Sequence, residues 1–113
     1  YFKENKPNAK IIGIEPEESP LLTKGYSGQH LIQGIGANFV PKTYLSQYID
    51  EVITVKGKES IEMAKKIRDY ENIDIGISSG AALLGAINFI KEKRITNKNI
   101  VVVFPDKGDR YSW

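Results

Sequence analysis

The chain has 113 residues, the ordinary length of one domain, of which 41% are apolar and 27% are charged. This composition is typical of a folded, water-soluble domain and excludes disordered and membrane-embedded chains. The net charge of +2 comes from interspersed signs, which excludes a basic stripe for nucleic acid or a membrane surface. The absence of cysteine excludes disulfides and cysteine-based metal sites, and the start YFKENKPNAK has no signal-peptide character, so we expect a cytoplasmic protein.

The first elements in chain order are two predicted strands separated by a long irregular segment. The run KIIGIE, Lys10–Glu15, is apolar and closed by Pro16, which favours a strand buried in a parallel sheet. The segment 16–50 is rich in glycine and proline, and irregular segments of this length are often functional. The run EVITV, Glu51–Val55, is rich in β-branched residues and predicts a second strand.

Two helices and a further strand are expected in the second half. Apolar residues recur every three positions over Ser60–Tyr70, which predicts an amphipathic helix. The segment Ala81–Ile90 is apolar on nearly every side and then becomes basic, as expected of a mostly buried helix that begins near Gly80 and ends near Lys93. The run IVVVF, Ile100–Phe104, ends at a proline and predicts a buried strand.

Alternating strands and helices predict an α/β layered domain with a mainly parallel sheet. In such sheets ligands bind beyond the carboxyl ends of the strands. The short run Ile73–Ile75 leads into GISSGAA, and IVVVF leads into PDKGDRY. If both runs are parallel strands, Ser78 and Asp106 open onto the same edge of the sheet.

The adjacent serines Ser78 and Ser79 allow three interpretations: a helix N-cap, a nucleophile, or one side of a ligand cradle. Serine is strongly preferred at N-caps, so capping is the simplest of the three. The segment Gly76–Gly80 also matches the G-x-S-x-G pattern of serine hydrolases. In that class the histidine base follows the nucleophile, whereas the single histidine of this chain, His30, precedes it. A hydrolase is therefore disfavoured.

The segment Ser27–Ala37 is glycine-spaced, so its backbone could approach a ligand closely. It lacks the third glycine of a dinucleotide fingerprint, which argues against a Rossmann site. His30 has no companion His, Cys or carboxylate at metal-ligand spacing, so no metal site is expected.

The motifs IIGIEPEESPLL, GQHLIQGIGANFVP, IDEVITV, GISSGAA and VVVFPDKGDRY, taken together and in this order, resemble those of cysteine synthase (O-acetylserine sulfhydrylase). That family belongs to the β-family, or fold type II, of pyridoxal-phosphate enzymes. The resemblance implies that residues 1–113 form a single partial α/β domain, the C-terminal portion of such an enzyme and an incomplete part of its large lobe.

The resemblance also implies roles for individual residues. The first serine of GISSGAA hydrogen-bonds the pyridine nitrogen of pyridoxal 5'-phosphate in the family, and Ser78 matches it. The QGIG segment borders the mouth of the active site, so the residues expected to face substrate, with His30 close by, are Gln33, Gly34, Ile35 and Gly36. Ser79 and Asp106 are expected just behind the residues that contact the cofactor and the substrate.

The Schiff-base lysine, the loop that binds the substrate carboxylate and the phosphate loop of the family are not found in this chain. It therefore contains no catalytic residue of its own by this comparison, and we expect it to be inert alone. The implied reaction of the full-length enzyme is replacement of the acetoxy group of O-acetyl-L-serine by sulfide, giving L-cysteine. The implied partners are a second copy in a homodimer and serine acetyltransferase, with no nucleic acid and no membrane. The alternatives are a cystathionine β-synthase-like enzyme and a non-catalytic α/β module that binds a partner or small ligand.

Overall fold

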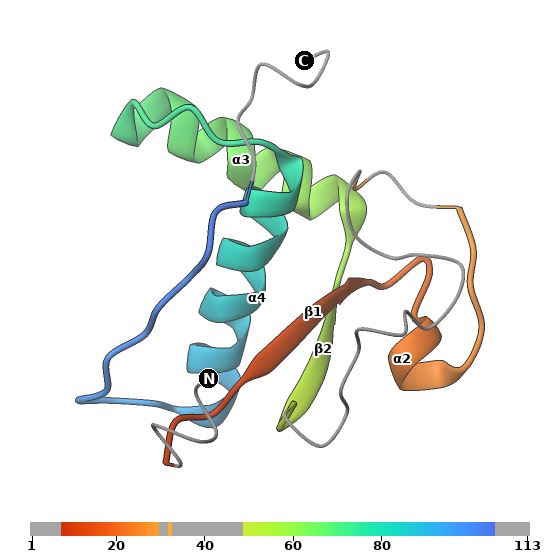
Figure 1. Cartoon of the computed structure of the whole chain (residues 1–113). Helices are drawn as coiled ribbons and strands as arrows, with labels where there is room; N and C mark the ends of the chain where they lie inside the picture. Colours follow the sequence, from red (N-terminus) through yellow and green to blue (C-terminus); the bar gives the residue numbers. More distant parts are fainter. Residues whose placement is uncertain (1–7, 30–31, 33–48, 106–113) are drawn as a thin grey trace.

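The computed structural model describes residues 8–29, 32 and 49–105. Strand β1 (Ile12–Pro16) lies parallel to strand β2 (Glu51–Val55), in a register that pairs Ile12 with Glu51 and Pro16 with Val55. The predicted α/β class with a parallel sheet is confirmed (Figure 1). The β-branched run EVITV forms a strand along its whole length, whereas the first predicted strand begins two residues later than the sequence indicated and includes Pro16.

The helices follow the strands in the predicted order. The short helix α2 (Leu21–Lys24) comes after β1, and the long helices α3 (Gly57–Glu71) and α4 (Ile77–Lys93) come after β2. Helix α3 begins three residues before the predicted Ser60, and its predicted apolar residue Tyr70 is 82% exposed. Both long helices are confirmed as elements.

Helix α4 contacts both α3 and the sheet. It runs beside both strands, and α3 crosses it near its beginning (Figure 1). A Cβ added at Gly85 of α4 would meet the side chains of Ile14 in β1 and Ile53 in β2, so the helix packs closely on one face of the sheet. The buried apolar cluster that joins the layers consists of Ile32, Val55, Ile77, Ala81 and Leu84.

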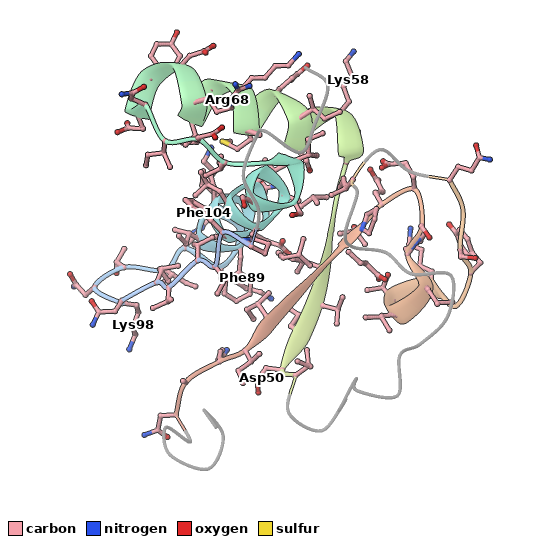
Figure 2. The ribbon with its side chains drawn as sticks, turned by 45° about the horizontal axis from the view of Figure 1, so that its top comes forward. Asp50, Lys58, Arg68, Phe89, Lys98 and Phe104 are labelled. Carbon is pink, nitrogen blue, oxygen red and sulfur yellow. The ribbon has the colours of Figure 1, made fainter. Side chains whose placement is uncertain are left out.

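The segment Ile100–Phe104 corrects one expectation. It was predicted as a buried strand, but the structure gives it no strand pairing, and Val101 and Val103 are 85% and 70% exposed. The short run Ile73–Ile75 is also not a strand. A strand requires a neighbour that accepts and donates its backbone hydrogen bonds, and the apolar composition of IVVVF does not supply one. The segment instead runs back along α4 and ends beside the first turns of that helix, where Phe104 lies over it (Figure 2).

Candidate functional site

The candidate site is the beginning of α4, where the two adjacent serines lie. The helix starts at Ile77, one residue before Ser78, and its N-cap is Gly76 in an extended conformation without any side-chain cap hydrogen bond. The capping interpretation of the serines is therefore wrong. An N-cap residue must have non-helical backbone angles, and here glycine takes that position while both serines lie in the first helical turn.

Both serine side chains are buried. Ser78 is 6% exposed to solvent, and Ser79 is fully buried. Their neighbours Ile77 and Ala81 belong to the core cluster, so the first turn of α4 is fixed by packing on both sides of the serines. The side chain of Ser78 is therefore almost entirely covered within the described structure.

The electrostatic character of this helix start is positive without a charged side chain. The first turn of α4 carries no acidic residue. The basic residues at the end of the helix, Lys91 and Lys93, lie in its last turn. The first backbone N–H groups of a helix lack intrahelical acceptors, and together with the helix dipole they give its beginning a partial positive charge. The arrangement suits an electron-rich neutral acceptor or an anion better than a cation.

A close helix crossing holds the serines in place. A Cβ added at Gly80 would lie 2.8 Å from the Cβ of Ala64 and 2.9 Å from its backbone nitrogen, and closer still to the carbonyl oxygen of Ser60. No side chain larger than hydrogen fits there without moving α3. Gly80, the second glycine of GISSGAA, is therefore required for the close approach of α3 and α4.

A second group of buried polar residues lies at the turn after β1, and the sequence analysis did not identify it. Glu15 is 3% exposed, and its carboxylate accepts hydrogen bonds from the backbone N–H of Leu22 and of Thr23, both at 2.9 Å, and from the Thr23 hydroxyl at 2.6 Å. These bonds satisfy N–H groups at the start of α2, which has no local side-chain cap. The sequence offered one signal for this residue: Glu15 is a charged residue at the end of the predicted buried strand KIIGIE.

The same turn contacts two further segments. The backbone N–H of Gly28 donates to the Ser19 hydroxyl at 3.0 Å, and the backbone N–H of Gly57, the first residue of α3, donates to the Glu18 carboxylate at 2.9 Å. Ser19 is fully buried. The turn therefore joins β1, the loop after α2 and the start of α3.

Several predicted site residues lie outside the described part of the chain: His30, Gln33, Gly34, Ile35, Gly36 and Asp106. The described residue Ile32, which directly precedes Gln33, is fully buried in the same cluster as Ile77 and Ala81. Within the described ranges, no group of three or more His, Asp or Glu side chains is arranged to hold a metal ion. Within the same ranges, no helix is both long enough and apolar enough to cross a bilayer.

Comparison with known proteins gives the family. Residues 1–106 match the family described as "Pyridoxal-phosphate dependent enzyme". The chain is 47% identical over 116 aligned positions to the cysteine synthase of Buchnera aphidicola subsp. Schizaphis graminum, covering 97% of this chain and 36% of the relative. It therefore spans about a third of the length of that curated relative.

Solved structures agree with this assignment. The crystal structure of the cysteine synthase of Entamoeba histolytica matches with a TM-score of 0.91 and 41% identity, over 96% of this chain and 32% of that one. The O-acetylserine-dependent cystathionine β-synthase of Helicobacter pylori matches with a TM-score of 0.86 and 35% identity, over 98% and 36% of the two chains. The chain has the fold of part of a fold type II enzyme, and it belongs to the pyridoxal-phosphate-dependent enzyme family.

Proposed function

We propose that this chain is the C-terminal part of a cysteine synthase, which replaces the acetoxy group of O-acetyl-L-serine by sulfide to give L-cysteine. The observation that carries the proposal is the first turn of α4, where Ser78 offers a covered, uncharged hydroxyl without an acidic neighbour in the turn. The identity to curated cysteine synthases supports the same assignment.

The residues present suit one end of pyridoxal phosphate. The Ser78 hydroxyl donates a hydrogen bond to the pyridine nitrogen in this proposal, because a neutral donor suits an unprotonated ring nitrogen. The partial positive charge at the start of α4 opposes protonation of that nitrogen. When bound, the cofactor supplies the electron sink for removal of the α-proton and the β-leaving group.

A neutral ring nitrogen has a consequence for the type of reaction. A carboxylate in place of Ser78 would hold the nitrogen protonated and strengthen the electron sink, as transamination requires. The neutral hydroxyl of Ser78 leaves the cofactor ring a weaker electron sink, which favours loss of a β-substituent over transamination. Ser79, which is fully buried beside it, supports the backbone of the turn and does not contact the cofactor.

The substrate side of the site is assigned to His30 and Gln33–Gly36, with Asp106 behind the cofactor. Ile32 supports this assignment because it ties the chain directly before Gln33 to the core residues that flank Ser78. The described end of the 100–105 segment beside the first turns of α4 supports the assignment of Asp106, the next residue in the chain (Figures 1 and 2).

A spectroscopic comparison tests the proposal. The 113-residue chain and the complete synthase that we propose it belongs to are each mixed with pyridoxal phosphate. The complete enzyme is expected to show the visible absorption of lysine-bound cofactor and to form cysteine from O-acetyl-L-serine and sulfide. The chain alone is expected to show neither, because no lysine in it matches the Schiff-base lysine of the family.

Two results would contradict this account. Visible absorption by the chain alone, bleached on addition of amino-acid substrate, would show that it is not inert. A complete protein that folds but binds no cofactor would instead favour the non-catalytic module.

A second candidate is a cystathionine β-synthase-like enzyme, which the similarity to the Helicobacter pylori protein supports. The two functions differ in the nucleophile, which is sulfide in one and homocysteine in the other. A competition assay with both nucleophiles separates them, and we expect sulfide to be preferred. We further propose that the complete enzyme is a cytoplasmic homodimer that can associate with serine acetyltransferase, which gel filtration with and without that protein tests.

A further inference from the structure

The start of α3 is capped by a side chain from a distant part of the sequence. Its N-cap residue, Lys56, makes no side-chain cap hydrogen bond, and the backbone N–H of Gly57, the first helical residue, has no acceptor within the helix. The Glu18 carboxylate, from the turn after β1, accepts a hydrogen bond from that N–H at 2.9 Å. Its negative charge also suits the positive end of the helix dipole. One contact between residues 39 positions apart therefore joins this turn to α3.

The backbone is held on both sides of Glu18. The backbone N–H of Glu17 donates to the carbonyl oxygen of Val55, at the end of β2, at 2.8 Å. The backbone N–H of Ser19 donates to the carbonyl oxygen of Pro16 at 3.1 Å, and Ser19 itself is fully buried. Pro16 and Val55 are partners in the parallel sheet. The Glu18 carboxylate is therefore presented to α3 from a fixed position at the end of the two strands.

The first turn of α3 is also the surface against which α4 begins. Ser60 follows Gly57 by one turn, and both its backbone N–H and its hydroxyl donate to the carbonyl oxygen of Lys56, at 3.0 and 2.9 Å. The carbonyl oxygen of Ser60 is the atom nearest to the position that a Cβ on Gly80 would occupy. Gly80 comes two residues after Ser78 at the beginning of α4. A displacement of the α3 start therefore reaches Ser78 through one helical turn and one close backbone contact.

We propose that Glu18 is a positioning residue for the cofactor end of the site: by binding the first N–H of α3, it keeps Ser60 against α4 and so fixes the Ser78 hydroxyl where it meets the pyridine nitrogen. This inference rests on the proposed function, and it assigns a role in cofactor affinity to an exposed carboxylate outside the cofactor contacts. Loss of the contact leaves the core intact, because Glu18 is not part of it, but frees the first turn of α3 to move away from Gly80.

The test measures the apparent dissociation constant of pyridoxal phosphate in the complete synthase. Glu18→Ala is expected to raise this constant by roughly fivefold to tenfold, the effect of one lost hydrogen bond to the cofactor. Glu18→Gln keeps an oxygen acceptor for the Gly57 N–H and should stay within about twofold of wild type. In a Ser78→Ala background, Glu18→Ala is expected to change the constant by less than about twofold, because the hydroxyl that Glu18 positions is already absent.

Two control variants separate this role from general effects of charge and stability. Glu17→Ala removes an equal charge from the adjacent exposed position. Glu15→Gln weakens buried hydrogen bonds to α2 and so lowers stability without touching α3. Neither control is expected to change the dissociation constant by more than about twofold. Hydrogen exchange of the Gly57 amide, followed by mass spectrometry, gives a readout that does not depend on the cofactor, and exchange is expected to be about tenfold faster in Glu18→Ala and unchanged in both controls.

Several results would overturn the positioning role. Unchanged exchange in Glu18→Ala would show that the contact is not made in solution. Faster exchange with an unchanged dissociation constant, or an equal rise of that constant in either control, would leave Glu18 a cap for α3 and nothing more. A rise in Glu18→Gln as large as in Glu18→Ala would exclude the hydrogen bond as the cause. The same rise from Glu18→Ala in the Ser78→Ala background would show that Glu18 acts on another part of the site.

Failure of the proposed function is recognised separately, from the wild-type protein. A complete wild-type protein that binds the cofactor but forms no cysteine would overturn the proposed reaction alone, because the dissociation constants still test the role of Glu18. A complete protein that binds no cofactor would overturn both the proposed function and the positioning role.

Discussion

The close crossing of α3 and α4 gives a quantitative prediction for Gly80→Ala. The added Cβ would lie 2.8 Å from the Cβ of Ala64, against ordinary contacts of 3.4–4 Å, so the helices must separate by about half an ångström or more. The nearest atom, the carbonyl oxygen of Ser60, belongs to the helix backbone and cannot rotate away. Overpacking of this kind costs about 1–3 kcal/mol, and the better helix propensity of alanine offsets about 1 kcal/mol of it.

Because the nearest obstacle is backbone, the overpacking cost is expected in the upper part of that range, about 2–3 kcal/mol, so the expected net loss in the free energy of unfolding is about 1–2 kcal/mol. The assay is urea unfolding of the 113-residue chain followed by circular dichroism. With a denaturant slope of about 1–1.5 kcal/mol per M for a chain of this size, the midpoint should fall by about 1 M.

Gly85→Ala is the matched control on the same helix. Its added Cβ would first meet the terminal Cδ1 of Ile14, which can rotate, while the Cδ1 of Ile53 lies at 3.5 Å. The same propensity gain applies, so Gly85→Ala should lie within about 1 kcal/mol of wild type. The reasoning is refuted if Gly80→Ala unfolds at the same urea concentration as Gly85→Ala or at a higher one.

Two further predictions concern the buried polar residues. In the complete synthase, Ser78→Asp is expected to keep the fold but to lose most cysteine formation, because a carboxylate would hold the pyridine nitrogen of the cofactor protonated. Turnover assays that show no change would remove Ser78 from the cofactor site. In the 113-residue chain, Glu15→Gln is expected to cost about 2 kcal/mol of stability in urea unfolding, because one amide oxygen replaces two carboxylate oxygens and the amide N–H groups face other donors. The neighbouring, exposed Glu17→Gln should cost almost nothing, and equal losses in the two variants would contradict the assigned role of Glu15.

The sequence predicted those elements whose local pattern agrees with their packing. The β-branched run Glu51–Val55 forms a strand, and the three-residue apolar spacing from Ser60 gives a helix. The same reasoning failed for Ile100–Phe104, which has the composition of a buried strand but no neighbouring strand in the described chain and lies largely exposed. Strand propensity describes how well side chains suit a pleated, half-buried surface, and it does not provide the hydrogen-bonding neighbour.

For the candidate site, too, the sequence predicted some features and only the structure showed others. For the serines of GISSGAA the sequence favoured an N-cap, and only the backbone angles of Gly76 showed that both serines lie inside the helix. Glu15 left only a weak signal in the sequence, a glutamate at the end of an apolar run, and the contact between Ser19 and Gly28 left none, because its two residues meet only through the fold of the chain.

The sequence by itself determined the class of fold and the family resemblance, because these follow from residue order and local periodicity. The tertiary structure alone decided which face of α4 is covered, why Gly80 must be glycine, and which turn holds both the loop at Gly28 and the start of α3. These features depend on distances between residues far apart in the chain. Such distances are set by the packing of helices and strands against one another, and no local pattern encodes them.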